Sequence, residues 1–484
     1  MDKKQFRILI IVFSSFAIGF VLTLVVLDPV IWLGIYEQTD LAPGTKAYQQ
    51  WLRSSVDIYF QAYFFNLTNP EEFIAGQKPI VRQIGPYTYR EVRYKTDVFK
   101  QLLSKTLQYK EVKQYHFEPH LSARPESDII TNVNLGYLTI DVKFGWLPAV
   151  VDRAVEFLEN RTGDYLITKR TVKEWLWGYE DPLLILLKSV FIPVPTTMIG
   201  LYLDKNNTDD GLIEIYASNK QAETFGHIYK YHNSKTLSCW TTQQANQING
   251  SDGSLFHPFL QMTEHPYIFS ADICRSIQIR PQYKTQLHGV PVIKYMPYAD
   301  TFSSPLTTEK NRGFCINWPN CMKDNVFDVS TCIKGAPIAM SLPHLQHADP
   351  SYQELIIGLN PTDDMNTSFF VEPNTGVVFS ASKKLQINAI VRRNPKFHQL
   401  SNVLDLFLPI MFMNESFNVD NKTADDIRLS VIQGPLITKA VMSTIVVILI
   451  ASIIALVLYY IYRYRRTNTE VSDYTSVPTE PEIV

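Results

Sequence analysis

Two long apolar runs without a charged residue, 8–27 and 440–462, lie at opposite ends of this chain. A hydrocarbon core about 30 Å thick needs about 20 helical residues to cross it, so each run is long enough to span a membrane. Because one charge at mid-bilayer costs on the order of 2.5–3.5 kcal/mol, the absence of charge in both runs is informative. The sequence therefore predicts a segment, 28–439, that is attached to a membrane at both ends.

The first run is also compatible with a signal peptide, because Lys3, Lys4 and Arg7 precede it. Signal-peptide cores are usually about 7–15 residues long and end in a small-x-small cleavage site. This run is longer and continues through Leu27 into Asp28. We expect an uncleaved membrane anchor.

Basic residues flank the outer sides of both runs, which favours cytosolic termini and an extracellular or lumenal middle segment. The flanking residues are Lys3, Lys4 and Arg7 at one end and Arg463, Arg465 and Arg466 at the other. The expected layout is a cytosolic tail (1–7), a span (8–27), an ectodomain (28–439), a second span (440–462) and a second cytosolic tail (463–484).

The N-glycosylation sequons agree with this layout, because all of them lie between the two runs. They begin at Asn66, Asn160, Asn206, Asn249, Asn366, Asn414 and Asn421.

All five cysteines also lie in the ectodomain, where an oxidising compartment would pair four and leave one unpaired. Two bridges can be drawn among five cysteines in fifteen ways, and the residues alone do not choose between them. A metal site is the competing interpretation. The chain has no C-x-x-C, and its only H-x-x-H, at His344 and His347, has no adjacent cysteine. We therefore expect disulfides, with no structural metal and no cofactor.

Composition and patterning favour one large mixed domain. The net charge of −2 offers no basic field for nucleic acid, and no linker or repeat marks a domain boundary. Period-two patterns predict strands, two turn-bounded segments predict hairpins, and three-and-four spacing predicts a helix. The strands are expected at 81–94, 107–117, 275–284 and 290–296, the hairpins at 199–217 and 370–391, and the helix at 148–160. The expected fold is mainly antiparallel β with helical insertions.

Several segments together resemble the class B scavenger receptor family. They are YFFNLTNPEEFIAGQKPIVRQIGPYTYRE (63–91), WLWGYEDPLL (175–184), INGSDGSLFHP (248–258), DICRSI (272–277), GFCINWPNC (313–321), GAPIAMSLPH (335–344), EPNTGVVFSASKKLQIN (372–388) and LPIMFMNES (408–416). That family includes the fatty-acid translocase, the high-density-lipoprotein receptor, insect sensory neuron membrane proteins and a lysosomal integral membrane protein. The similarity runs in order along nearly the whole chain.

The resemblance implies an antiparallel β-barrel-like ectodomain with a hydrophobic tunnel and an α-helical cap bundle at about 146–187. It also implies bridges Cys274–Cys332 and Cys315–Cys321, with Cys239 as a free thiol. The C-x5-C spacing of Cys315 and Cys321 is most similar to that of the lysosomal branch of the family.

Candidate ligand-binding residues follow from the same resemblance. Arg153 and Arg161 lie in the expected cap, where surface receptors of the family bind anionic lipids and oxidised lipoproteins, although Arg161 also suits a solvated helix face. Lys334 is a candidate partner for a fatty-acid carboxylate, or else a surface lysine. No histidine occurs between His120 and His227, so release of an enzyme cargo by a titrating cap histidine is not expected.

The second cytosolic tail is too short and polar to fold, and it carries possible sorting signals. Tyr474 and Val477 form a Y-x-x-Φ motif for a clathrin adaptor, and the C-terminal residues suit a PDZ groove.

The sequence bears on three classes of function: an ecto-enzyme, a lipid or lysosomal receptor, and an adhesion or cargo-binding protein. No nucleophile elbow, zinc-protease motif or P-loop is present, so an ecto-enzyme is not expected. The preferred hypothesis is a scavenger receptor that binds lipid or lipoprotein at the cap and passes fatty acid or cholesterol through a tunnel to the membrane. It would sort between the plasma membrane and the endosome or lysosome membrane. The alternative is a lysosomal membrane glycoprotein that binds a lumenal hydrolase and exports lipid. An adhesion or cargo-binding protein without lipid transport also stays open.

Overall fold

The computed structural model describes residues 3–54, 56–101, 105–144, 165–189, 194, 196–218, 222–362 and 365–474. The chain forms two compact units. The helical unit consists of Met1–Glu37 and Lys422–Val484, and the sheet unit is Gln38–Asn421.

The helical unit contains two long apolar helices, α1 (Lys3–Thr39) and α10 (Gly434–Tyr474). Two helical segments, Arg7–Thr39 and Asn421–Arg466, are long and apolar enough to cross a membrane. The second begins in the helical turns before α10. Both predicted runs fall inside these segments. Lys439 of α10 pairs with Asp28 of α1.

Two short elements lead into α10, namely α9 (Asn421–Ile427) and the π-helical turn η8 (Arg428–Gln433). Beyond the apolar run α10 continues through polar residues to Tyr474, so the expectation of an unfolded tail after residue 462 is wrong as far as that residue. Adding a residue to an existing helix gains one hydrogen bond without a new nucleation cost, which is why a polar segment can extend it.

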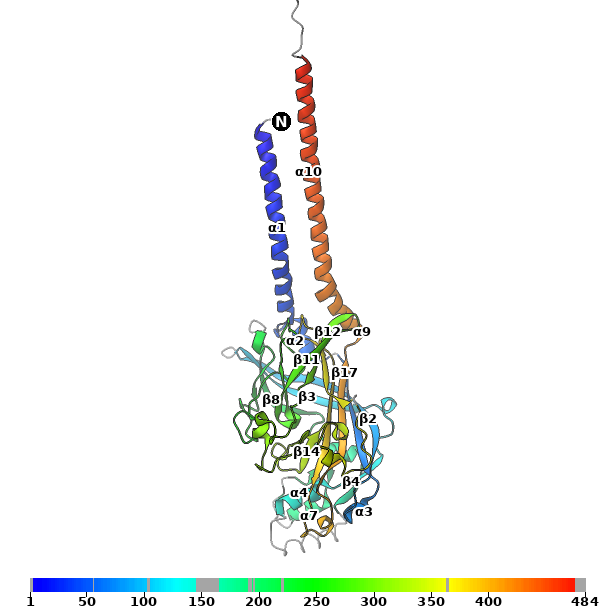
Figure 1. Cartoon of the computed structure of the whole chain (residues 1–484). Helices are drawn as coiled ribbons and strands as arrows, with labels where there is room; N and C mark the ends of the chain where they lie inside the picture. Colours follow the sequence, from blue (N-terminus) through cyan, green and yellow to red (C-terminus); the bar gives the residue numbers. More distant parts are fainter. Residues whose placement is uncertain are drawn as a thin grey trace, which may run out of the picture. The chain divides into compact units, whose positions relative to one another are not determined.

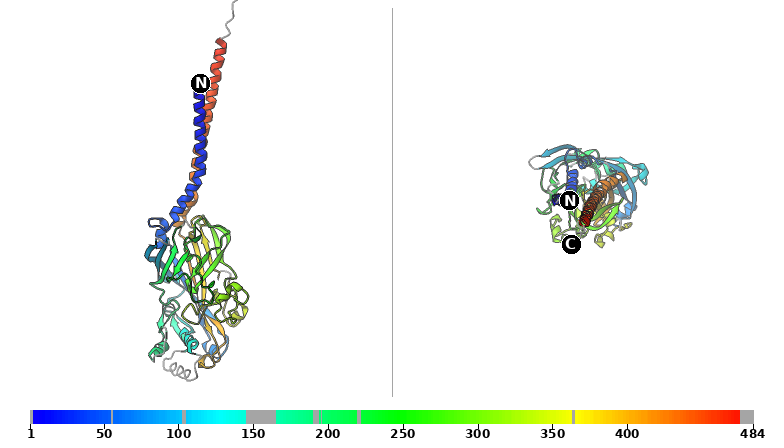
Figure 2. Two further views of the ribbon diagram at one scale, coloured as in Figure 1. Left: turned by 90° about the vertical axis from the view of Figure 1, so that its left-hand side faces the viewer. Right: turned by 90° about the horizontal axis from the view of Figure 1, so that it is seen from above.

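The sheet unit is built on one large antiparallel sheet that curls to a nearly barrel-like form (Figures 1 and 2). In the described residues it has thirteen strands, with the path β10-β11-β12-β15-β16-β17-β1-β2-β3-β8-β9 and with β13 and β14 joined through β16. The bounds are β1 (Ile58–Leu67), β2 (Val81–Gln101), β3 (Thr106–Phe117), β8 (Thr208–Tyr216), β9 (Ile228–Tyr231), β10 (Tyr267–Ser270), β11 (Arg275–Leu287), β12 (Val290–Pro297), β13 (Val326–Asp328), β14 (Ile338–Ser341), β15 (Ser368–Val371), β16 (Val378–Val391) and β17 (Leu406–Asn418).

The four period-two patterns are confirmed as β2, β3, β11 and β12. The hairpin at 370–391 is also confirmed, because β15 and β16 pair antiparallel around a tight turn. Glu372 stabilises that turn by accepting hydrogen bonds from the backbone N–H groups of Asn374 and Thr375 at 3.0 and 2.8 Å. Gly376 follows with φ +74°, a conformation that favours glycine.

The predicted hairpin at 199–217 is wrong. Ile199 belongs to β7 (Met198–Ile199), which pairs with β6 (Tyr179–Glu180), whereas β8 pairs with β3 and β9. Between β7 and β8 the N–H groups of Leu201 and Tyr202 donate to backbone carbonyls of Trp175 and Leu176, both at 2.8 Å. These tertiary bonds keep the segment after β7 from pairing with β8.

Short helices and two-stranded sheets complete the sheet unit. In Figure 1, α4, α7 and β4 gather at the end of this unit opposite α2. The remaining elements are α2 (Lys46–Leu52), α3 (Pro70–Ile74), α4 (Leu135–Phe144), α6 (Val172–Trp177), α7 (Pro182–Ser189), α8 (Pro350–Gln353), β4 (Ile129–Val133), β5 (Ile167–Thr171) and the 3-10 turns η1 (Pro119–Leu121), η2 (Ala222–Thr224), η3 (Ala271–Ile273), η4 (Glu309–Phe314), η5 (Pro343–Leu345) and η7 (His398–Leu400). The predicted helix 148–160 lies outside the described residues.

Candidate functional site

Charged side chains interrupt an aromatic face of β2 and β3. Alternate residues of a strand share a face, so Tyr89, Glu91 and Arg93 of β2 point the same way. The antiparallel register sets Glu91 beside Tyr115 of β3 and Arg93 beside Lys113. Because Tyr89 is 1% exposed and Glu91 is 2% exposed, this face points into the sheet unit.

Neighbouring strands extend this row of charges. Arg93 donates from Nε to Glu91 Oε1 at 2.6 Å and from Nη2 to Glu415 Oε1 of β17 at 2.5 Å. Glu415 lies opposite Lys383 of β16, which pairs with Asp272 of η3. We call the whole set the charged belt: Glu91, Arg93, Lys95, Glu111, Lys113, Lys205, Asp210, Asp272, Lys383 and Glu415. Its carboxylates and cations are equal in number and balance when all are ionised.

The carboxyl groups of the belt titrate differently. Burial raises the pKa of Glu91, against the attraction of Arg93, and the charge of Glu415 raises it further. Burial alone would also raise the pKa of Glu415, but Arg93, Lys383 and Lys113 outweigh it and lower that pKa to about 2. Acidification therefore protonates Glu91 first and leaves the belt with an excess of positive charge.

The belt borders accessible space. Arg93 and Glu415 each keep 21% of their side-chain surface exposed, and Lys383 and Asp272 keep 28% and 32%. Water that reaches these groups reduces the desolvation cost that fully buried ion pairs carry. The belt is therefore accessible at these four residues and buried at Glu91 and Lys95, whose side chains are 0% and 6% exposed.

An aromatic cluster adjoins the belt: Phe60, Tyr89, Tyr115, Trp177 and Tyr202. Ring centroids lie 4.7 Å apart for Phe60 and Tyr202, 5.1 Å for Tyr115 and Trp177, and 5.3 Å for Tyr89 and Trp177. Tilted and edge-on rings at such distances attract one another. The apolar cluster and the charged belt therefore lie side by side, through Tyr89 and Tyr115 on the strands that carry Glu91 and Lys113.

The disulfides join Cys274 to Cys332 and Cys315 to Cys321, with Cα–Cα distances of 6.2 and 5.3 Å. These are the pairs that the family resemblance implies. Among the described residues, Cys239 has a free and half-buried thiol. Burial raises the pKa of this thiol.

The sequon asparagines that the structure describes all reach the surface to some extent. Asn206 and Asn421 are exposed, whereas Asn66, Asn249, Asn366 and Asn414 are half-buried. Asn66 uses Oδ1, which a glycan leaves unmodified, to accept from the N–H of Thr131 at 2.8 Å. In Asn414, by contrast, Nδ2, the atom that would carry a glycan, donates to Gln61 Oε1 at 3.0 Å. Asn160 lies outside the described residues.

The candidate ligand and sorting residues are only partly described. Lys334 is exposed and has φ +58°. Arg153, Arg161 and Val477 lie outside the described residues, and Tyr474 is the last residue of α10.

The two histidines of the H-x-x-H pattern have different environments. His344 is 3% exposed, and its Nε2 lies 2.6 Å from Gln83 Oε1. Its Nδ1 accepts from the N–H of Asn360 at 3.0 Å, so the proton is on Nε2. His347 is exposed. In the described part of the chain, no group of three His, Cys, Asp or Glu side chains is placed to hold a metal ion.

Comparison with known proteins shows the family to which the chain belongs. A family model described as the CD36 family matches residues 8–461, which include most of both apolar helices and the complete sheet unit. The chain belongs to the CD36 family. The resemblance to class B scavenger receptors is thereby confirmed.

CD36-family relatives of two kinds align with most of the chain. Lysosome membrane protein 2 of Mus musculus is 34% identical over 399 residues, which are 82% of this chain and 82% of that protein. Scavenger receptor class B member 1 of Bos taurus is 28% identical over 427 residues, covering 87% and 82%. The protein of the same name from Sus scrofa is 30% identical over 412 residues, covering 84% and 79%. These relatives are named as a membrane protein and as receptors, and none is named as an enzyme.

The sequence analysis missed the charged belt. A charged residue at alternate positions of a strand usually marks the solvent face, and Glu91, Arg93 and Lys95 fit that reading. The informative signal is continuity with Tyr87 and Tyr89, because large aromatic residues precede the charges on the same face.

Proposed function

We propose that this CD36-family protein is a two-pass receptor that binds lipid or lipoprotein ligands and passes their hydrophobic cargo through the sheet unit to the membrane. The observation that carries the proposal is the family match over residues 8–461, together with apolar helices that precede and follow the sheet unit in the sequence.

The charged belt and the aromatic cluster support an amphipathic cargo. Aromatic rings offer a large apolar contact area for an acyl or sterol body. A polar end group would meet hydrated cations and carboxylates at the belt, where Arg93 and Lys113 already lie between acidic partners. A fatty acid or cholesterol, each with one polar end, fits this surface better than a lipid without any polar group.

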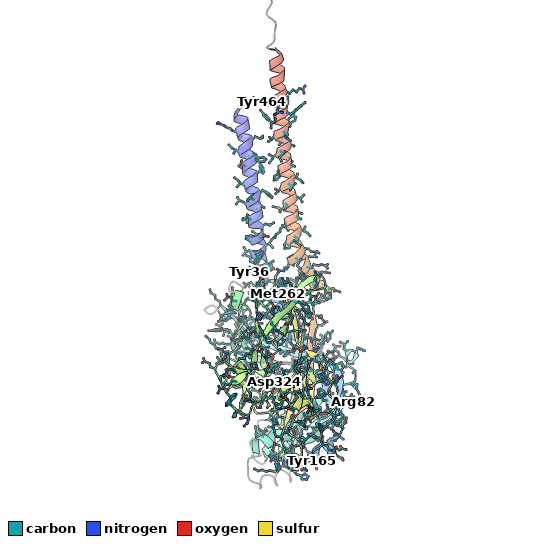
Figure 3. All side chains as sticks on the ribbon, viewed as in Figure 1. Tyr36, Arg82, Tyr165, Met262, Asp324 and Tyr464 are labelled. Atoms are coloured by element: carbon teal, nitrogen blue, oxygen red, sulfur yellow. A yellow bond between two sulfur atoms is a disulfide. The ribbon has the colours of Figure 1, made fainter. Side chains whose placement is uncertain are left out.

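The cap, at about residues 146–187, is the proposed docking surface for the ligand. The described part of this segment begins at Tyr165 (Figure 3) and contains β5, α6, β6 and most of α7. Thr171 and Glu174 form a reciprocal cap at the start of α6, with Glu174 Oε2 accepting from the N–H of Thr171 at 2.8 Å. This capping box satisfies two backbone N–H groups at the start of α6 and stabilises that end of the helix. Arg153 and Arg161 would provide the anionic-ligand contacts.

Topology and sorting belong to the same proposal. Both termini would be cytosolic and the sheet unit extracellular or lumenal, with glycans on most of the sequons. Tyr474 and Val477 would engage a clathrin adaptor, and the C-terminus a PDZ protein, so that the receptor cycles between the plasma membrane and the endosome or lysosome membrane.

Photo-crosslinking of the full-length glycosylated protein with fatty-acid and cholesterol probes, at neutral and lysosomal pH, tests the conduit. Tyr202→Ala removes a ring of the aromatic cluster, and Tyr283→Ala, at a side chain that is 50% exposed, is the matched control. We expect saturable adducts near the cluster that fall in Tyr202→Ala only. Labelling no better than that of an unrelated glycoprotein would exclude the conduit.

The second candidate function is a lysosomal membrane glycoprotein that binds a lumenal hydrolase and exports lipid. The 34% identity to lysosome membrane protein 2 of Mus musculus favours it. Steady-state localisation of the tagged chain in cells, with Tyr474→Ala as the sorting variant, separates the two. Lysosomal residence together with co-purification of a hydrolase would support this second function.

A further inference from the structure

A second binding space lies in the sheet unit, apart from the charged belt and the aromatic cluster. It is a cavity of about 940 Å³ beside η4 and the loop closed by the Cys315–Cys321 bridge. Asp324, labelled in Figure 3, follows that loop and accepts from the N–H of Ser304 at 2.6 Å. The cavity walls include Arg275, Phe302, Phe314, Trp318, Met322 and Phe327.

Arg275 is the unusual member of this wall, because it is a cation that is only 6% exposed. Its Nη2 donates to Asn311 Oδ1 at 2.7 Å, while its buried Nε has no hydrogen-bond partner among the described residues. Asn311 cannot turn away, since its Nδ2 donates to the backbone carbonyls of Asp300 and Ser303 at 3.0 and 2.8 Å. The guanidinium therefore keeps unused donors beside the cavity.

No carboxylate of the described residues contacts this guanidinium. Asp300 is the acidic group whose charge it senses, but Asp300 Oδ2 pairs with Lys310 at 2.7 Å and forms no ion pair with Arg275 within 4.0 Å. Burial outweighs the attraction of Asp300 and lowers the pKa of Arg275 to about 9. A buried cation without a contacting anion is costly, and an anion supplied by a ligand would remove that cost.

Aromatic rings hold the guanidinium in place. Its Cζ lies 3.7 Å from the ring centroid of Phe314, 5.2 Å from that of Phe327 and 5.5 Å from that of Phe302. Ring faces attract a cation but do not replace in-plane acceptors for its N–H groups. The rings therefore orient Arg275 without satisfying it.

Part of the wall offers apolar surface, beside polar residues such as Asn317, Asn320 and Ser330. Trp318 lies in the loop between Cys315 and Cys321, and its side chain is 48% exposed, so a ligand in the cavity can reach it. The Cζ atom of Arg312 lies 4.6 Å from its ring centroid. Met322, from the same wall, is a flexible side chain that adapts to varied ligands.

We propose that this cavity binds a carboxylate carried by an apolar body, with the carboxylate oxygens accepting hydrogen bonds from Arg275 and the body contacting Trp318 and Met322. An aligned pair of charge-assisted hydrogen bonds is the interaction that a planar guanidinium makes best with a carboxylate. A long-chain acid and a compact aromatic acid share this chemistry, and the test distinguishes them.

The test uses the full-length glycosylated protein in amphipol, with dodecanoate, phenylacetate and dodecanol as probes in equilibrium binding. Dodecanoate should bind at least about 10-fold more tightly than dodecanol, because the alcohol leaves Arg275 without its anion. Binding of phenylacetate as well would identify a site for compact acids, whereas binding of dodecanoate alone would identify an acyl site.

Matched variants assign the cation. Arg275→Gln should weaken dodecanoate binding by about 10- to 100-fold. Arg392→Gln, at an exposed arginine of the same wall, should change it by less than about twofold. If Arg275→Gln fails to fold, the decision rests on the comparison of acid with alcohol in the unmodified protein and on Trp318→Ala, which should weaken dodecanoate binding.

Three results would overturn the proposal. The first is that neither acid binds, and the second is that dodecanol binds as tightly as dodecanoate. The third is that Arg392→Gln, and not Arg275→Gln, loses affinity. Because lipid crosslinking at the aromatic cluster is measured separately, failure here leaves the conduit result unchanged, and failure of the conduit leaves this site unchanged.

Discussion

His344 should make the sheet unit less stable in acid. Burial lowers the pKa of His344 from 6.5 to about 4. Because the folded state resists protonation, the stability that neutral His344 contributes is fully present above pH 6.5 and is lost as the pH falls from 6.5 towards 4. At pH 5 an unfolded histidine is mostly protonated while His344 is mostly neutral, which corresponds to a loss of about 2 kcal/mol relative to pH 7.5.

The variant His344→Asn removes the titration and keeps a local acceptor. Asparagine tolerates the left-handed conformation at this position, where φ is +55°, and its Oδ1 can accept from the N–H of Asn360. Loss of the bond to Gln83 should cost about 1 kcal/mol at pH 7.5. On acidification to pH 5 the variant should lose about 2 kcal/mol less than the parent protein, so that the order of stability inverts.

Urea unfolding of the full-length protein in detergent, followed by tryptophan fluorescence at pH 7.5 and pH 5, measures this difference. His347→Asn is the matched control, because His347 is exposed and has a similar φ of +59°. It should follow the parent protein at both pH values. Equal acid sensitivity of the parent protein and His344→Asn would refute the reasoning.

Three further predictions concern backbone, charge and thiol chemistry. A Cβ at Gly376 (φ +74°) would lie 2.1 Å from the carbonyl oxygen of Phe256, whereas one at Gly335 (φ +84°) meets nothing within 4 Å. In both alanine variants the left-handed backbone conformation costs about 1–2 kcal/mol of stability. Only Gly376→Ala adds a steric clash, so only this variant should lose export to the cell surface or lysosome, and equal export of the two variants would contradict this prediction. Glu415→Gln leaves Arg93 with Glu91 as its charged partner and should destabilise the protein by about 1–3 kcal/mol in the same unfolding assay, with an unchanged midpoint as the contrary result. Since burial raises the pKa of Cys239, its alkylation by iodoacetamide at pH 7.5 should be several-fold slower than that of free cysteine, and a comparable rate would show an accessible thiolate.

Much of the sheet could be predicted from local pattern. The segments 81–94 and 107–117 alternate in a way that only a strand supports, and Asn374 to Gly376 forms the turn that joins β15 to β16. The error at 199–217 has a tertiary cause, because Trp175 and Leu176 supply backbone acceptors from a distant helix. Local pattern cannot show that competition.

The sites were less predictable. The cysteine pairs came from resemblance, since five cysteines alone leave fifteen choices open. The charged belt and the cavity beside Arg275 depend on side chains that register and packing bring together from distant segments. The bond between Arg93 and Glu415, for example, joins residues 322 positions apart.

The pairing of the first long strand with the last also constrains how the protein is made. β1 lies between β2 and β17 in the sheet, and Gln61 contacts Asn414 across 353 positions of sequence. While the chain is being synthesised, β1 and β16 each present an unpaired edge until β17 is available. Contacts of such long sequence separation form slowly, and open strand edges favour aggregation in the interval. A truncation before β17 should therefore leave an intermediate with exposed strand edges that needs a chaperone, and not a smaller folded domain.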